Sequence, residues 1–503
     1  MRKTCEAYGL LGKILLISIW RKRGRREQLL PLVLRFGRKM GYDRPKKRQG
    51  NDKMKEQTSQ IHIVIPEDVS AILKTLSGAG FEAYAVGGCV RDSLLGRRPQ
   101  DWDITTSAMP EQVKSLFDRT FDTGIEHGTV TVLQNGVGYE VTTYRIDGTY
   151  ADGRHPDSVI FTRNLREDLL RRDFTINAMA CNEEEGLVDL FGGLEDLEQG
   201  VIRCVGNARE RFSEDALRIL RGVRFAAQLG FELEEETREG MRLLAPALRK
   251  ISAERVQAEL IKILESDRPD MLRTAWELGI TAQFLPEFDR MMETEQETPH
   301  HMYSVGEHTL HALLNVRKDK VLRLTMLFHD MGKPDLKTVD QNGTAHFKKH
   351  AGRSEELTKQ ILRRLKFDND TLKKVTVLVR YHDYRMPAEA ACVRRAIYRI
   401  GKELFPLYLE VRRADVAAQS RYQREEKMAD IEAVEQLYRG IIERGDCVSL
   451  KELAVNGKDL IREGFAPGKS LGSLLDRLLD AVLEDPALNQ KETLLELAGK
   501  LSS

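Results

Sequence analysis

The chain has 503 residues, which is too many for one ordinary domain, so we expect several. The formal net charge is only +1, yet residues 1–55 hold 17 Lys and Arg against 4 Asp and Glu, which leaves the rest of the chain acidic. A uniformly basic body is therefore excluded, and any surface for nucleic acid has to be a local basic stripe.

The first 58 residues differ in composition from the remainder. An apolar run from Tyr8 to Trp20 is shorter than the roughly 20 residues of a membrane span, so we expect no contact with a membrane. A secretory signal carries its positive charge before the run, whereas the cluster RKRGRR follows it, and an Arg-rich organelle presequence fits only in part. We predict that residues 1–58 are a basic, poorly ordered extension or an over-long start of the reading frame.

The six cysteines are scattered and form no Cys-x-x-Cys pair. This pattern is typical of free thiols in a reducing compartment and not of a disulfide framework. We therefore expect the protein to be cytoplasmic.

The segment from Ile61 to Asp189 alternates helical and strand patterns. An apolar entry leads into a helix from Pro66, which we expect to end at Gly78 or Gly80. The strand EAYAVGG follows, and Pro110 begins a further short helix. The alternating run GTVTVLQNGVGYEVTTYR predicts a β-hairpin, since Asn-Gly between β-branched residues is a strong turn signal.

The stretch AVGGCVRDSLLGRRPQDWDITTSA combines a glycine turn, an arginine and two aspartates. Gly87 and Gly88 let backbone N–H groups approach phosphate oxygens closely, and Arg91 adds a fork of donors. Asp101 and Asp103 lie two apart, so on a strand both carboxylates face one side, an arrangement that suits Mg²⁺. Each half alone is an ordinary turn or a solvated Asp-x-Asp, but together and in this order they indicate a nucleoside triphosphate site.

A second motif, LLRRDFTINAMA, begins at Leu169. Arg171 and Arg172 can contact a triphosphate, and Asp173 can accept a hydrogen bond from a ribose hydroxyl and so favour ribonucleotides. Out of this context the same triplet is a solvated helix start. The polar, glycine-rich run from Asp147 to Asp157 predicts a flexible loop before the motif.

A helix is predicted over residues 210–228, because apolar residues recur there every three or four positions. Asp215, Arg218, Arg221 and Arg224 lie three apart and form a neighbouring stripe. Since arginine donates and aspartate accepts hydrogen bonds, the stripe can pair with the edge of a base. The alternative is an ordinary salt-bridged helix surface.

These motifs resemble those of the polymerase-β-type nucleotidyltransferases, most closely the class that contains tRNA CCA-adding enzymes and bacterial poly(A) polymerases. The resemblance covers most of residues 60–503. It implies an α+β fold, in which a small mixed sheet bears the metal carboxylates and an all-helical neck, body and tail follow. It also implies that Asp101 and Asp103 hold Mg²⁺ and that Glu140, otherwise an exposed strand glutamate, completes the catalytic set.

The resemblance extends to nucleotide selection. It implies that Asp215 and Arg218 read the Watson–Crick edge of cytosine or adenine, while Arg221 and Arg224 support the base or touch phosphate. The loop at 147–157 is of full length, which argues against an enzyme that adds only CC. The implied partners are tRNA, ATP and CTP.

Eight of the eleven histidines fall between His300 and His382. Their order resembles the HD-domain phosphohydrolases, which implies a divalent metal site; imidazole ligands favour Ni²⁺, Co²⁺, Mn²⁺ or Zn²⁺. The alternative is a metal-free relic with ordinary helix histidines. The implied ligands are His308, His329, Asp330 and Asp415; His350 and His382 are assigned to a second metal or to phosphate, and His300, His301 and His311 to the surface or to a supporting role.

The tail begins with a charged helix that we expect to end at Gly445, and its NGKDL element resembles the segment that grips the outer arm of tRNA. Gly457 permits close backbone approach and Lys458 is the candidate phosphate contact. The predicted domains are the extension (1–58), nucleotidyltransferase head (59–192), neck (193–266), body helices (267–297), HD phosphohydrolase domain (298–420) and helical tRNA-binding tail (421–503).

The predicted function is template-independent addition of CCA to the 3′ end of tRNA from CTP and ATP, with a second, metal-dependent phosphohydrolase activity. Two alternatives stay open: an A-adding enzyme or poly(A) polymerase of the same fold, and an RNA-binding HD phosphohydrolase. No GxxxxGK[ST] motif precedes a helix, which disfavours a kinase or ATPase. The sequence predicts no particular oligomeric state.

Overall fold

The computed structural model describes residues 63–148, 159–298, 300 and 302–502. The predicted N-terminal extension (1–58) and nearly all of the predicted loop from Asp147 to Asp157 lie outside these residues. None of the helices in the described part is both long enough and apolar enough to cross a membrane.

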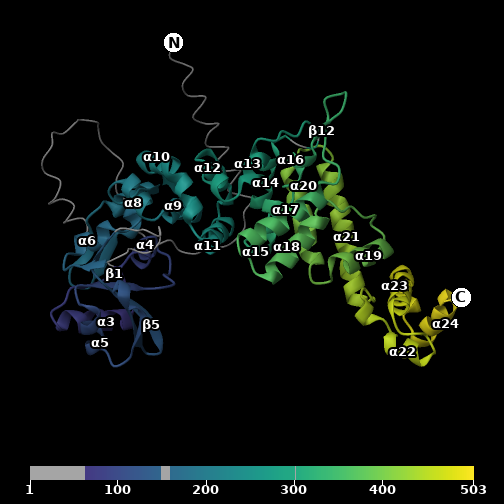
Figure 1. Ribbon diagram of the computed structural model, residues 1–503, viewed down its shortest axis with the longest axis horizontal. Coiled ribbons are helices and arrows are strands. Elements are labelled where there is room, and N and C mark those ends of the chain that lie inside the picture. Colours follow the sequence, from purple (N-terminus) through teal and green to yellow (C-terminus); the bar gives the residue numbers. More distant parts are fainter. Residues whose placement is uncertain (1–62, 149–158, 299, 301, 503) are drawn as a thin grey trace, which may run out of the picture. The chain divides into compact units, whose positions relative to one another are not determined.

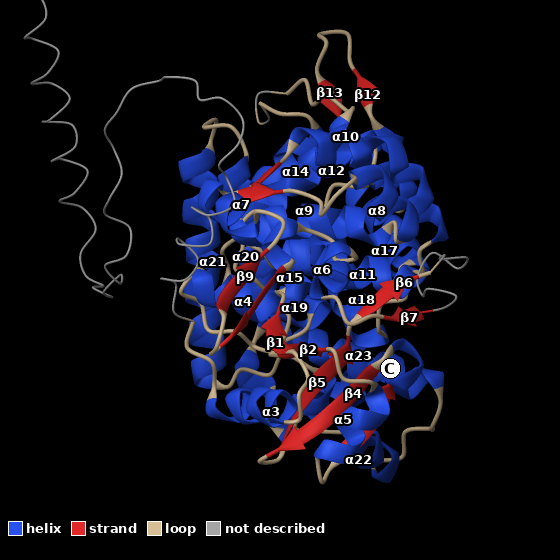
Figure 2. Cartoon of the chain, turned by 90° about the vertical axis from the view of Figure 1, so that its left-hand side faces the viewer, coloured by secondary structure: helices blue, strands red, loops and turns tan. Residues whose placement is uncertain are grey.

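A mixed sheet forms the first part of the described chain (Figures 1 and 2). Its seven strands have the order β3-β4-β5-β2-β1-β8-β9, in which β2 and β5 run parallel and the other neighbours antiparallel. The mixed sheet confirms the α+β prediction. The strands are β1 (Ala83–Val86), β2 (Asp103–Thr106), β3 (Thr120–Gly124), β4 (Thr129–Gln134), β5 (Val137–Thr143), β8 (Met179–Asn182) and β9 (Gly186–Asp189).

Local sequence explains these elements. α3 (Glu67–Gly78) buries Val69, Ile72 and Leu76 at helical spacing and contacts β1, whose four residues are all buried. α5 (Pro110–Leu116) begins at its proline and contacts β4 and β5. Asn135 and Gly136 both have positive φ, 49° and 83°, as a tight hairpin turn between β4 and β5 requires. The predicted helix starts and the hairpin are therefore confirmed.

The neck departs from the prediction of one helix over 210–228. The chain forms α8 (Ala208–Glu214) and α9 (Leu217–Leu229), and Asp215 between them is extended, with φ −137° and ψ 103°. Its Oδ1 accepts a hydrogen bond from the backbone N–H of Leu217 at 3.0 Å, as a capping aspartate does. Aspartate favours helix caps over helix interiors, which is why the break falls there. Asp215 therefore does not continue the helical stripe of the three arginines.

Helices make up most of the other described residues, which also form three two-stranded ladders that the sequence did not predict: β6 (Arg145–Asp147) with β7 (Val159–Phe161), β10 (Val201–Ile202) with β11 (Glu232–Leu233), and β12 (Thr338–Val339) with β13 (Ala345–His346). The charged helix α21 (Arg424–Arg444) ends before Gly445, as predicted. The other helices are α4 (Gly88–Leu94), α6 (Leu165–Leu170), α7 (Gly193–Gln199), α10 (Glu235–Leu244), α11 (Ala253–Leu264), α12 (Leu272–Glu277), α13 (Pro286–Met292), α14 (Val305–Leu314), α15 (Lys320–Phe328), α16 (Lys333–Leu336), α17 (His350–Arg364), α18 (Asn369–Tyr381), α19 (Ala390–Ile400), α20 (Phe405–Ala418), α21 (Arg424–Arg444), α22 (Gly457–Arg462), α23 (Lys469–Glu484) and α24 (Lys491–Ser502).

The apolar cores do not follow the predicted domain boundaries. One continuous core joins the sheet, the neck and the helices that carry the first histidines, from Val69 to Ala418. A second core lies among α18–α21, so the boundary predicted at residue 420 falls inside it. A third core, from Cys447 to Ala498, belongs to the tail alone.

Candidate functional site

A cavity of about 1040 Å³ is lined by residues of both the sheet and the neck helices. Its size is at the upper end of the range for ligand pockets, which leaves room for a nucleotide and more. Most of the residues predicted to handle a nucleotide meet here: Gly87, Gly88, Arg91, Asp101, Asp103, Arg171, Arg172, Asp173, Asp215, Arg218, Arg221 and Arg224.

The predicted glycine turn lies at the start of α4. Gly87 is the N-cap with φ 84°, a conformation that favours glycine, and a Cβ there would lie 3.0 Å from Arg172 Nη1. The backbone can therefore approach a bound group closely at this point. Arg91 is held by hydrogen bonds to Asn177 Oδ1 at 2.6 Å and to the carboxylate of Asp92.

Three carboxylates converge on one side of the sheet. β2 begins at Asp103, so Asp101 precedes the strand instead of lying on it. Glu140 lies beside Asp103, because parallel pairing joins the next residues of β2 and β5, Ile104 and Val141. Burial raises the pKa of Asp103, and Asp101 raises it further while Arg172 lowers it. Burial also raises the pKa of Glu140, together with the charges of Asp103 and Asp101.

Such a set fits a divalent cation. Mutual repulsion and burial disfavour the charged forms of these carboxylates, and a bound cation removes both penalties. Oxygen ligands of this kind are the ones that Mg²⁺ takes in proteins.

The arginine pair after α6 lines the same cavity as the glycine turn, Asp101 and Asp103. Arg172 lowers the pKa of Asp103, so its charge is close to the carboxylates. Its Nε is buried and has no hydrogen-bond partner among the described residues, which leaves a donor for a ligand. Arg171 is bound to Asp168 through Nε at 3.0 Å and Nη2 at 2.7 Å.

Asp173 is occupied by the protein itself. Its Oδ2 accepts hydrogen bonds from Arg221 Nε at 2.8 Å and Nη2 at 2.6 Å, and its Oδ1 accepts from Asn177 and from the backbone of Phe174. Although burial opposes the charge, the ion pair with Arg221 holds the pKa of Asp173 well below its usual range. A ribose hydroxyl would have to share these oxygens.

The two residues predicted to read the base are each fixed by other partners. Asp215 pairs with Arg255 of α11 at 2.7 Å. Arg218 pairs with Glu214 at 2.6 Å and donates to the backbone carbonyl of Arg171 at 2.9 Å. Both residues line the cavity, and these pairs fix their positions in the cavity wall before a base binds. Arg255 and Glu214 had no distinguishing pattern in the sequence.

Three arginines lie around one aromatic ring at the cavity wall. Arg91, Arg221 and Arg224 lie 5.1, 5.5 and 4.0 Å from the centre of the Phe225 ring. Arg224 pairs with Glu259 of α11 at 3.1 Å, and both side chains are buried. Burial lowers the pKa of Arg224 to about 10 in spite of Glu259. The sequence signalled neither Phe225 nor Glu259, since both fit an ordinary helix pattern.

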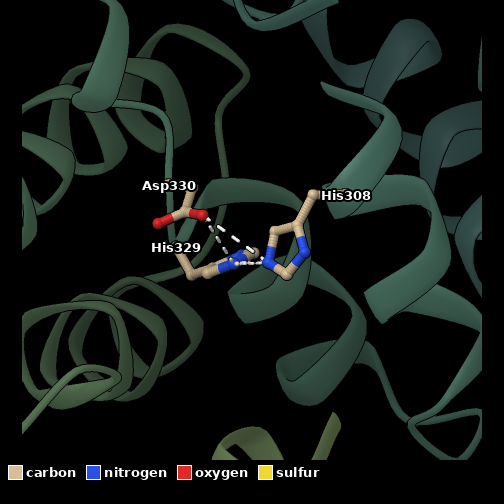
Figure 3. A group of neighbouring side chains, drawn as sticks. All are labelled: His308, His329 and Asp330. Carbon is tan, nitrogen blue, oxygen red and sulfur yellow. Dashed lines mark hydrogen bonds and ion pairs between the residues drawn. The ribbon is translucent and has the colours of Figure 1, made fainter. Parts of the chain in front are cut away.

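A second group of possible ligands lies among α14, α15, α17 and α20. His308, His329 and Asp330 bring their ligand atoms within 4.8 Å of one another, and Figure 3 shows both rings and the carboxylate directed to one point. Asp415 joins them, with its Oδ1 2.9 Å from His308 Nε2. The predicted set is thus brought together, and all four side chains are buried.

Asp330 also belongs to a second trio of possible metal ligands. Asp330, His350 and His382 bring ligand atoms within 4.8 Å, with Asp330 Oδ1 3.3 Å from His350 Nε2 and 3.4 Å from His382 Nε2. Despite burial, His329 and Lys333 hold the pKa of Asp330 well below its ordinary value. The sequence assigned His350 and His382 to a second metal or to phosphate, and the structure places both against Asp330.

Backbone carbonyls orient three of these rings. The Nδ1 atoms of His329, His350 and His382 lie 2.7, 2.9 and 2.8 Å from carbonyls three residues earlier in the chain. A carbonyl can only accept, so each Nδ1 carries a proton, and in its neutral form each ring then offers the lone pair of Nε2 to a metal. Metal-binding histidines are prepared in this way. The donor set therefore fits a divalent transition metal.

The remaining predicted residues lie apart from both clusters or at their edges. His300 lines a cavity of about 320 Å³ beside the histidines and lies 3.1 Å from Lys427 Nζ, in keeping with a supporting role. His311 stacks on Tyr303, and His301 lies outside the described residues. Lys458 is exposed in the first turn of α22, where its backbone N–H is capped by Asn456.

Family models match three parts of the chain. Residues 83–203 match the poly A polymerase head domain, residues 230–292 the probable RNA and SrmB-binding site of polymerase A, and residues 340–498 the putative tRNA nucleotidyltransferase domain 2. The first match covers the glycine turn, the carboxylates and the arginine pair described above.

Whole-chain comparisons agree with these matches. The chain is 37% identical over 432 residues to the CCA-adding enzyme of Streptococcus thermophilus, covering 84% of this chain and 94% of that protein. It is 57% identical over 197 residues to the CCA-adding enzyme of Leuconostoc mesenteroides, covering 39% of this chain and 49% of that protein. The crystal structure of the Bacillus stearothermophilus CCA-adding enzyme in complex with CTP aligns with a TM-score of 0.65 and 29% identity, over 87% of this chain and 98% of that one. The chain therefore belongs to the family of CCA-adding enzymes.

Proposed function

We propose that this protein adds C, C and A to the 3′ end of tRNA from CTP and ATP, without a nucleic-acid template. The single observation that carries the proposal is the shared cavity, in which the glycine turn, Asp101, Asp103 and the neck arginines meet. Family membership supports it, as does the likeness to a relative whose structure is described as a complex with CTP. The free thiols of the five described cysteines support a cytoplasmic location.

Each group in the cavity has a chemical task. The backbone N–H groups in the first turn of α4, which follows Gly87, and the Arg172 side chain bind the triphosphate, where the unused Nε of Arg172 supplies a donor. Asp173 orders Arg221, while Asp215, which precedes α9, and Arg218 of α9 face the incoming base. Since arginine donates and aspartate accepts, cytosine and adenine match this edge better than uracil or guanine.

Transfer in this family is metal-dependent, and we assign the metal to Asp101, Asp103 and Glu140. The metal is Mg²⁺, in keeping with an all-oxygen set of ligands. When bound, it lowers the pKa of the attacking 3′-hydroxyl and neutralises the leaving pyrophosphate. The carboxylates and Arg172 hold opposite charges close together, so they place the reacting phosphate between them.

The test is incorporation of label from CTP into tRNA that lacks its CCA end. Incorporation from CTP supports the proposal, because an A-adding enzyme or a poly(A) polymerase would use ATP alone. Incorporation from ATP only, on RNA without CC, would assign the cavity to one of those activities instead.

A second function is favoured by the buried histidine cluster. We propose that residues around His308, His329, Asp330 and Asp415 form an HD-type phosphohydrolase site that binds Ni²⁺, Co²⁺ or Mn²⁺. The oriented Nε2 atoms and the shared Asp330 support a metal site, and the trio of Asp330, His350 and His382 supports a second ion. Lys333, Lys349 and Lys427 line the adjoining cavity and give it the charge to accept a phosphoester.

The assay is hydrolysis of a 2′,3′-cyclic nucleotide across a series of divalent metals. We expect turnover with one or more of Ni²⁺, Co²⁺ and Mn²⁺. Absence of turnover with every metal, in protein that still extends tRNA, would leave the cluster without a hydrolytic role.

A further inference from the structure

A fully buried carboxylate lies behind the arginine pair. Asp168 on α6 is 0% exposed and is not among the residues that line the nucleotide cavity. Charged side chains are costly to bury unless they are well paired, so the burial of Asp168 depends on its partners. They are Thr105 Oγ1 at 3.0 Å, Arg171 Nε at 3.0 Å and Nη2 at 2.7 Å, Arg172 Nη2 at 3.5 Å and the backbone N–H of Arg145 at 3.4 Å.

These partners come from separate parts of the site. Thr105 lies two residues after Asp103 on β2, so both side chains are on one face of the sheet. Arg171 and Arg172 line the cavity on that side. Arg145 begins β6, the strand that leads to the segment predicted as the flexible loop. Asp168 therefore contacts the strand that carries Asp103, both arginines and the first residue of β6.

The two oxygens of the Asp168 carboxylate contact different partners. Oδ2 accepts from Thr105 and pairs with Arg172, while Oδ1 accepts from both ends of the Arg171 fork. Arg172 also lies against Gly87 and acts on Asp103. Asp168 thus pairs with this guanidinium, whose Nε has no hydrogen-bond partner among the described residues. A guanidinium held in this way loses less freedom when a phosphate binds.

We infer that Asp168 is a positioning residue for nucleotidyl transfer, which aligns the triphosphate-binding arginines with the strand that carries Asp103. The inference rests on the proposed transfer reaction. Asp168 touches no substrate; it acts through Arg171, Arg172 and Thr105. Its loss is expected to weaken recognition of phosphate, while recognition of the base, which depends on α9, is unchanged.

The chain offers a matched control. Asp196 is also buried, accepts from Thr175 Oγ1 at 2.6 Å and pairs with Arg203 Nε at 3.1 Å, but none of these three residues lines the cavity. Asp168→Asn and Asp196→Asn therefore remove the same charge from similar networks. Only the first network reaches the nucleotide site.

The experiment compares wild type and both variants in the full-length protein. For Asp168→Asn we expect KM for CTP and for ATP to rise about 10- to 100-fold, the effect of losing charge-assisted hydrogen bonds. Competition by inorganic triphosphate should weaken in parallel, while the ratio of CTP to UTP incorporation stays unchanged. Both variants should lower the melting temperature of the protein by similar amounts. Asp196→Asn should leave KM and triphosphate competition as in wild type.

A second variant keeps every charge. Thr105→Val removes the link from Asp168 to β2 but leaves the arginine pairs, so we expect a lower kcat with little change in KM. If Asp168→Asn does not fold, this split still decides the matter: a Thr105→Val enzyme with wild-type kcat overturns the inference. Asp168→Asn that behaves like Asp196→Asn in all assays also overturns it. Wild-type protein without any incorporation would overturn the proposed transfer reaction as well.

Discussion

Glu259→Gln removes one member of the buried ion pair that joins α9 to α11. Arg224 and Glu259 lie 3.1 Å apart, and their side chains are only 9% and 6% exposed. Burial already lowers the pKa of Arg224 from 12.5 to about 10, which corresponds to roughly 3 kcal/mol against its charged form. Without Glu259 the guanidinium stays charged and unpaired, so we expect a loss of about 3–5 kcal/mol in the free energy of unfolding.

The measurement is urea denaturation followed by far-ultraviolet circular dichroism. Replacing both partners, in Arg224→Leu/Glu259→Leu, should restore most of the stability, because an apolar pair of similar volume removes the unpaired charge. The exposed pair Arg242–Glu239 is the control, and Glu239→Gln should cause no measurable change. A loss below about 1 kcal/mol in Glu259→Gln, or a double variant less stable than the single one, would refute the reasoning.

Three further predictions concern the two sites. Asp103→Ala should abolish addition of both C and A in a primer-extension gel while tRNA binding in a filter assay is retained; near-normal turnover would remove it from the metal set. Asp215→Ala should lower the preference for CTP over UTP about 10- to 100-fold, the contribution of one hydrogen-bonded recognition pair; an unchanged preference would place base reading elsewhere. His329→Ala/Asp330→Ala should lose binding of Ni²⁺ or Mn²⁺ by calorimetry and all phosphohydrolase activity, with CCA addition intact; simultaneous loss of both activities would contradict separate sites.

Local signals were sufficient where the chain follows local rules. The Asn135-Gly136 turn and the proline at the start of α5 were predicted because their backbone demands are met by neighbouring residues alone. The aspartate and histidine motifs were predicted because their residue types and order are rare outside such sites. At these places a short stretch of sequence determines most of the local structure.

Tertiary pairing explains what the sequence could not show. Asp168 lies in LREDLLRRD, which has the composition of a solvated helix, yet it is buried and bonded to Thr105, 63 residues earlier in the chain. Asp215 was placed within a helix by periodicity, whereas capping of α9 and the pair with Arg255 hold it outside. The contact of Asp330 with His350 and His382 depends on where α17 begins and α18 ends.

The most direct test of the central claim is one gel with tRNA shortened by its three terminal nucleotides. The shared cavity predicts that CTP alone extends this tRNA by two residues, that ATP alone does not extend it, and that both together restore the full end. The same reactions with Asp103→Ala protein should give no extended tRNA. Extension by ATP alone, or a long A tail with both nucleotides, would contradict a site built to add C, C and then A.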